Sequence, residues 1–142
     1  MDRLDADEAA LWHAFKNAAE SVRTKVAADI AAATGLSDPD FGILTRIVEL
    51  GGGRLRQNQL AESIGFHRSR LSHQLTRMEE RGLVTREPSG DGVEVVATQA
   101  GRAAVKKARP IHAAAVRTHL LERIGQRDRA AFRRALALLT DE

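Results

Sequence analysis

The sequence predicts a mainly α-helical fold that contains one small β-hairpin. Apolar residues recur at helical spacing through most of its 142 residues. Two short β-branched runs, separated by turn residues, interrupt this pattern over 83–97. Long amphipathic stretches precede and follow the central part of the chain. Because the chain has no cysteine, disulfides, thiolate metal sites and cysteine nucleophiles are excluded.

Two helices are predicted before the first glycine-rich break. Apolar side chains recur at steps of three or four over 5–33, and "TG" at 34–35 ends this first helix. The second begins in "LSDPDFGILTRIVEL", where Ser37 or Asp38 can cap the N-terminus and the proline suits the first turn. Three consecutive glycines at 51–53 end it.

Two shorter helices follow at once. "RQNQLAESIG" predicts a helix over 56–65 that ends at Gly65. After a two-residue link, "HRSRLSHQLTRMEERG" predicts a helix over 67–82. Its buried stripe is formed by Leu71, Leu75 and Met78.

The hairpin and the terminal helices complete the chain. "LVTRE" and "VEVVAT" have the length and β-branching of strands, and "PSGDG" between them is typical of a turn. Thr98 is the expected N-cap of a long helix that Pro110 must kink or divide. A last helix is expected after Gly125.

This order of elements predicts a winged helix-turn-helix module, with the hairpin as the wing, over residues 36–98. Residues 1–35 and 99–142 would form a separate helical region. The terminal helices carry more apolar surface than so small a module can cover. We therefore expect a homodimer interface built from about residues 6–33 and 99–140, the alternative being packing within one chain.

The helix over 67–82 has two different sides. Opposite its apolar stripe it presents Ser69, Arg70, His73, Thr76 and Arg77. Arginine can bind guanine through two hydrogen bonds, and serine, threonine and histidine can reach base edges or phosphates. A merely solvated helix more often shows Glu–Lys pairs at i, i+4 spacing.

The charge distribution supports the same interpretation. Residues 54–86 carry seven arginines, three glutamates and no lysine. Gln57 and Asn58 open the short helix, where free backbone N–H groups favour phosphate, and Arg54 and Arg56 precede it. A solvated surface remains the alternative for the charge alone, but helix, charge and hairpin together predict binding of double-stranded DNA.

"QLAESIGFHRSRLSHQLTRMEERGLVTRE" with the later "VVATQAGR" resembles the MarR family of bacterial winged helix-turn-helix regulators. Members of that family typically read "LAE", a glycine-containing turn, "SR" near the start of the recognition helix, "L…RGLV.R" and then "LT.AGR". The resemblance extends over essentially the whole chain. It implies a homodimer whose two winged modules bind a pseudo-palindromic operator, usually as a repressor that a small ligand releases.

The resemblance also implies which residues meet DNA. On the recognition helix, which is the predicted helix over 67–82, these would be Arg68, Ser69, Arg70, His73 and Arg77. Backbone contacts would come from Gln57 and its neighbours, with Arg86 at the base of the wing. Arg56, which precedes the short helix, and Thr76, on the outward side of the helix over 67–82, are also expected to contact DNA.

Two positions depart from the family pattern. His67 occupies a helix start where a serine or threonine cap is common. The wing tip contains Asp91 but no arginine, although such a wing often carries an arginine that enters the minor groove. The recognition helix would therefore carry more of the sequence specificity.

Other kinds of function fit the sequence less well. Ser69 and His73 are four residues apart, but no acid is placed to orient the histidine, so no catalytic site is expected. His13, His112 and His119 lack a metal-ligand pattern, so neither a metal nor a cofactor is expected. A winged-helix module used for protein–protein contact alone is the remaining alternative.

The resemblance also indicates where a small-molecule effector would bind. In related proteins the effector cleft lies between the dimer helices and the winged module, which makes Trp12 and His13 candidates for effector binding. No apolar run approaches the ~18 residues of a transmembrane helix, and the N-terminus is acidic. We therefore expect a cytoplasmic protein with no membrane partner.

Overall fold

The computed structural model describes residues 2–140. The chain divides into two compact units, one comprising residues 30–111 and the other the segments before residue 30 and after residue 111. The elements are mainly helices, together with one three-stranded antiparallel sheet, so the predicted fold class is confirmed.

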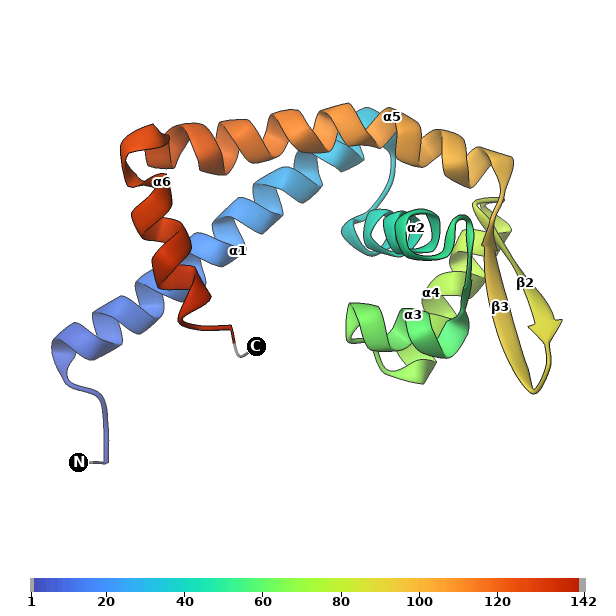
Figure 1. The fold of residues 1–142 in the computed structure, drawn as a ribbon, viewed down its shortest axis with the longest axis horizontal. Helices are drawn as coiled ribbons and strands as arrows, with labels where there is room; N and C mark the ends of the chain where they lie inside the picture. Colours follow the sequence, from blue (N-terminus) through green and yellow to red (C-terminus); the bar gives the residue numbers. More distant parts are fainter. Residues whose placement is uncertain (1, 141–142) are drawn as a thin grey trace. The chain divides into compact units, whose positions relative to one another are not determined.

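The unit of residues 30–111 holds the helix-turn-helix and the wing. Its elements are α2 (Asp38–Gly51), β1 (Arg54–Arg56), α3 (Gln57–Ile64), α4 (Arg68–Glu80), β2 (Val84–Ser89), β3 (Gly92–Ala97) and most of α5 (Gln99–Val116). Figure 1 shows α2, α3 and α4 beside the hairpin of β2 and β3. The strand order in the sheet is β1-β3-β2.

The helices α2 and α4 begin differently. At α2, Ser37 Oγ accepts a hydrogen bond from the Asp40 backbone at 3.2 Å, and Asp40 Oδ2 accepts one from the Ser37 backbone at 2.9 Å. This reciprocal capping box confirms Ser37 as the N-cap. At α4 the N-cap is His67, whose side chain makes no capping hydrogen bond.

The sheet differs from the prediction in two respects. β1 was not predicted, because three residues are too few to show an alternating pattern. β2 continues through Pro88 and Ser89, which had been expected to lie in the turn. Proline is tolerated there because β2 is an edge strand. The actual turn comprises two residues, and its first, Gly90, has a φ of 60° that favours glycine.

The apolar core of this unit lies beneath α4. Leu71, Leu75 and Met78 are completely buried, which confirms the predicted stripe. They are buried together with Ile43, Leu44, Ile47, Leu60, Val84, Val95 and Val105. One side of α4 is thus committed to the core, and its position in the unit is fixed.

The other unit contains most of α1 (Ala6–Thr34), the end of α5, the π-helical turn η1 (Arg117–Leu121) and α6 (Glu122–Ala137). At the start of α1, Asp5 accepts a hydrogen bond from the backbone of Glu8, which lowers the pKa of the Asp5 carboxyl. Pro110 does not divide α5, since the helix continues to Val116. Pro110 is solvent-exposed, so water can satisfy the carbonyl that its missing N–H leaves free.

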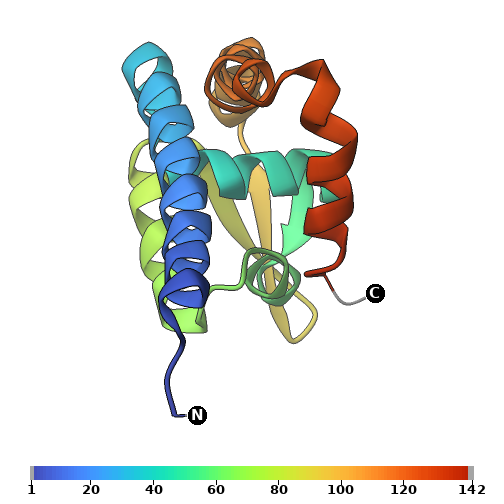
Figure 2. The same ribbon diagram turned by 90° about the vertical axis from the view of Figure 1, so that its left-hand side faces the viewer.

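The helical path breaks later, at Gly125, whose φ of 78° and ψ of 163° are not helical. The bend before the C-terminal helix is visible in Figures 1 and 2. The last helix therefore starts after Gly125, as predicted.

The helices of this unit leave large apolar side chains in solvent. On α1 the exposed fractions are 74% for Leu11, 50% for Trp12 and 46% for Phe15. Exposed apolar residues at the C-terminus are Phe132, Leu136, Leu138 and Leu139. None of the helices that the structure describes is long and apolar enough to cross a membrane.

Candidate nucleic-acid interface

The outward side of α4 carries most of the predicted DNA-contact residues. Arg68, Ser69, Arg70, His73, Thr76 and Arg77 are all exposed on this helix. Arg56 and Gln57, at the end of β1 and the start of α3, and Arg86 on β2 are half-buried. All nine lie in the unit of residues 30–111.

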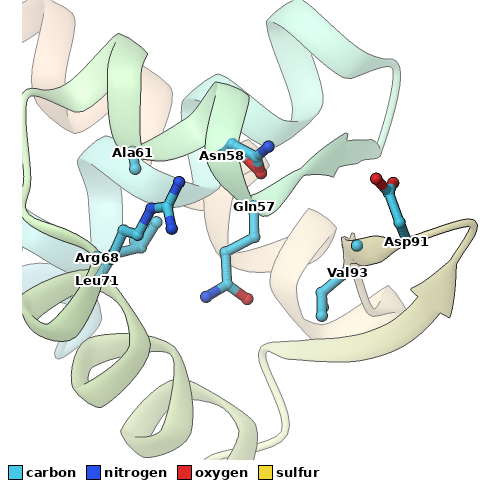
Figure 3. Close-up of a pocket in the computed structure, with 8 residues that line it drawn as sticks. Gln57, Asn58, Ala61, Arg68, Leu71, Asp91 and Val93 are labelled. Atoms are coloured by element: carbon cyan, nitrogen blue, oxygen red, sulfur yellow. The ribbon is translucent and has the colours of Figure 1, made fainter.

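An open pocket of about 310 Å³ lies where α3, α4 and the wing tip meet. It is lined by Gln57, Asn58, Ala61, Arg68, Leu71, Asp91, Gly92 and Val93. In Figure 3 the Gln57 side chain points into the space between Arg68 and Val93. The amide and guanidinium donors of two helices thus converge beside the wing, an arrangement that suits contact with a DNA backbone.

Arg70 is held by a neighbour that the sequence did not suggest. Its guanidinium carbon lies 3.7 Å from the centre of the Phe66 ring. Phe66 belongs to the short turn between α3 and α4. A cation–π contact of this kind restrains the guanidinium without using any of its N–H donors, so these stay available for a base or a phosphate.

Arg86 is engaged within the protein. Its Nε donates a hydrogen bond to Glu79 Oε1 at 2.8 Å, and its Nη2 lies 2.6 Å from the same oxygen. Nη2 also donates to Thr76 Oγ1 at 2.8 Å, and Nη1 to Ser72 Oγ at 3.3 Å. Arg86 therefore links β2 to α4, whereas the sequence had suggested a contact with DNA.

The Thr76 side chain is also hydrogen-bonded within the module. Its hydroxyl donates to the Ser72 carbonyl at 2.9 Å and accepts the hydrogen bond from Arg86. The donor that had been expected to face a base is thus used inside the module.

Arg56 links β1 to the wing tip. Its Nη1 donates to the Ser89 carbonyl at 3.3 Å, and its Nη2 lies 3.4 Å from Asp91 Oδ1. The preceding arginine of β1, Arg54, pairs with Glu87 and Glu94, and its hydrogen bond to Glu94 raises the pKa of Arg54. Both arginines thus hold the sheet and the wing together.

A buried polar cluster lies behind α4. Asp40 is 1% exposed, and its Oδ1 accepts a hydrogen bond from Gln74 Nε2 at 2.7 Å. Its Oδ2 accepts one from Arg81 Nη1 at 2.6 Å. Gln74 Oε1 in turn accepts one from Arg77 Nη2 at 2.6 Å.

This cluster was not predicted from the sequence. The available signal was Gln74 itself, a polar residue that follows Leu71 by three and precedes Met78 by four, on the apolar side of the helix.

The remaining predicted residues have few partners in the structure. Among residues 2–140, no hydrogen bond or ion pair engages the side chains of Arg68, Ser69 or His73.

In the other unit, Trp12 stacks on Phe15 with the ring centres 6.1 Å apart. His13 is exposed on the same helix, and within the described part of the chain no cluster of side chains is arranged to hold a metal ion.

Comparison with known proteins identifies the family. A model described as the MarR family matches residues 34–92. AbsC, a MarR family transcriptional regulator from Streptomyces coelicolor, is 30% identical, with a TM-score of 0.87 over 98% of this chain and 95% of AbsC. Sco3205, a MarR family regulator from the same organism whose structure is a complex with DNA, is 26% identical, with a TM-score of 0.83 over 98% of this chain and 89% of that one.

A more distant protein shows the same fold. The organohalide-sensing regulator RdhR-CbdbA1625, solved in a ligand-free form, is 20% identical, with a TM-score of 0.79 over 97% of this chain and 81% of that one. No curated protein sequence matches the chain significantly. The similarity to AbsC over nearly the full length of both proteins, together with the matching family model, shows that the chain belongs to the MarR family of transcriptional regulators.

Proposed function

We propose that this protein is a sequence-specific regulator that binds a pseudo-palindromic DNA operator as a homodimer and acts as a repressor. The observation that carries the proposal is the outward side of α4. It presents arginine, serine and histidine side chains that form no ion pair within residues 2–140, on a helix whose other side is fixed in the core. Sco3205, which is similar to this protein along almost the whole chain, was solved in complex with DNA, and this supports the proposal.

Direct DNA contacts are assigned to six residues. Ser69, Arg70, His73 and Arg77 would face the bases, and Gln57 and Arg68 would contact phosphates beside the pocket. Arg56, Thr76 and Arg86 are assigned an indirect part, since their hydrogen bonds hold the wing and α4 in place. Residues 36–98 thus form the DNA-binding module.

The homodimer is proposed from the exposed apolar side chains of the other unit. These side chains are too exposed to contribute to the packing of a single chain. They are Leu11, Trp12 and Phe15 on α1, and Leu138 and Leu139 at the C-terminus. A second copy of the chain would bury them, which assigns residues 1–35 and 99–142 to dimerisation. A two-fold dimer also matches a pseudo-palindromic site, because each protomer presents one α4 to one half-site.

Release by a small-molecule effector is part of the proposal because the chain belongs to a family in which such control is usual. RdhR-CbdbA1625 has also been solved in a 2,4-dichlorophenol-bound form. The candidates in this chain remain Trp12 and His13, both exposed on α1. Since the target is chromosomal DNA, the protein would act in the bacterial cytoplasm.

Selection of bound duplexes from a random pool, at two salt concentrations, tests the proposal. The expected product is a two-fold-symmetric site with half-sites about one helical turn apart, bound less tightly as salt increases. If no sequence is enriched and binding does not respond to salt, the protein is instead a winged-helix module for protein–protein contact.

A further inference from the structure

We infer that the buried carboxylate of Asp40 positions Arg77 for reading DNA, with Gln74 as the link between them. This inference rests on the proposed function and assigns a task to two residues that cannot themselves reach the DNA. Asp40 lies on α2 and is 1% exposed, and Gln74 lies on the inner side of α4 and is 7% exposed.

Asp40 is a stable anchor. Three groups donate to its carboxylate: the Ser37 backbone N–H at 2.9 Å, Gln74 Nε2 at 2.7 Å and Arg81 Nη1 at 2.6 Å. Arg81 supplies the opposite charge that a buried carboxylate needs. Arg81 Nη2 also donates to the Gly35 carbonyl at 3.2 Å, which fixes the far side of the cluster to the chain before α2.

The carboxylate determines which way the Gln74 amide is turned. An ionised carboxylate can accept hydrogen bonds but cannot donate them, so the NH₂ group of Gln74 must face Asp40. The amide oxygen then faces away from Asp40, where it accepts the hydrogen bond from Arg77 Nη2 at 2.6 Å. If the amide were reversed, its NH₂ would point at the guanidinium and the contact with Arg77 would be lost.

Arg77 is therefore held in one conformation before DNA arrives. The exposed arginine uses Nη2 for Gln74, while its other nitrogens form no hydrogen bond within residues 2–140. Restraining a long side chain in advance reduces the conformational entropy that binding must remove. A guanidinium with a fixed plane also discriminates better between base edges, because its paired hydrogen bonds have strict geometry.

Gln74→Met is the most direct test. Methionine is close to glutamine in size and favours helices, but it cannot form the hydrogen bond to Arg77. Asp40 keeps its bonds to Arg81 and Ser37 in this variant. We expect the ratio of affinities for selected operator and random duplex to fall roughly 3- to 10-fold, which corresponds to freeing one long side chain.

A double-mutant cycle separates positioning from a structural effect. In an Arg77→Ala background, Gln74→Met should cause no further loss of the affinity ratio, because the side chain that Gln74 positions is absent. If Gln74→Met reduces the ratio equally in both backgrounds, the inference is wrong. Leu50→Met, which places a methionine at an exposed position of α2 outside the DNA-contact residues and the proposed dimer segments, is the control and should leave the ratio unchanged.

A second measurement does not depend on the variant folding or on DNA binding. In the NMR spectrum of the free wild-type protein, the guanidinium of Arg77 should rotate slowly about its Nε–Cζ bond and give separate Nη signals. A single averaged Nη signal would overturn the inference. If wild-type protein shows no sequence preference but Arg77 is restrained, the proposed function fails while the positioning of Arg77 stands.

Discussion

The seven arginines between residues 54 and 86 differ in what their guanidinium groups contact. Four are ion-paired with carboxylates of the same module: Arg54, Arg56, Arg81 and Arg86. Three form no ion pair with any residue that the structure describes: Arg68, Arg70 and Arg77. These three are all exposed on α4, so the arginines of this segment that form no ion pair are concentrated on one helix.

Arg68→Ala should reduce the salt dependence of DNA binding. Each phosphate that a cation neutralises contributes about 0.9 to the slope of log K against log[salt], so losing one contact should lower the slope by about that amount. Binding measured at several salt concentrations gives this slope. Arg54→Ala is the control, because Arg54 is already paired with Glu87 and Glu94 and should leave the slope unchanged.

At the scale of elements, α4 is held from two sides. On one side the buried Asp40 bonds Gln74 and Arg81, and on the other Arg86 of the wing bonds Glu79 and Thr76. A recognition helix held in this way keeps its outward side chains in a constant orientation. Its N-terminus is less well stabilised, since His67 makes no capping hydrogen bond.

His67→Ser should stabilise the protein by about 0.5–1 kcal/mol, because serine can accept a hydrogen bond from a free N–H of the first turn. His67 already has the extended backbone of an N-cap, with a φ of −60° and a ψ of 151°. Thermal unfolding measures the effect. Ser37→Ala, which removes an existing cap, should destabilise by about 1 kcal/mol, and a His67→Ser protein that unfolds at or below the wild-type temperature would contradict the assignment.

The sequence predicted the helices of this protein well. Each helix carries apolar residues at helical spacing, and residues next to it in the sequence mark where it begins or ends. β1 escaped prediction because its pairing partner lies far along the chain, as in the pairing of Arg54 with Val96. In the candidate site, helical periodicity predicted which side chains face outward on α4. It could not predict that Thr76 and Arg86 are bonded to each other, since that contact depends on how β2 packs against α4.

At the scale of the whole molecule, the exposed apolar residues of α1 and α6 are the main feature that one chain does not explain. α6 has no buried residue in the part of the chain that the structure describes, although Phe132 and Leu136 lie along it. A second copy of the chain would remove this apolar surface from water. The same two-fold symmetry would present two copies of α4 to the operator.

Leu11→Asp should therefore shift the protein toward a monomer in sedimentation experiments at micromolar concentration. Leu11 is 74% exposed in the single chain, so the substitution should leave the chain's own packing intact. Leu50→Asp is the matched control, because Leu50 is 64% exposed on α2 in the winged module and should leave the dimer unchanged. A wild-type protein that sediments as a stable monomer would exclude the dimer.

The most direct test of the central claim, that the outward side of α4 reads DNA sequence, is the affinity of Arg70→Ala for selected operator and for random duplex. We expect the operator affinity to fall about 10- to 100-fold, with a much smaller loss on random DNA. Arg86→Ala, which loosens α4 and the wing together, should weaken both complexes to a similar extent. Equal losses on the two DNAs for Arg70→Ala would contradict direct reading of bases by this helix.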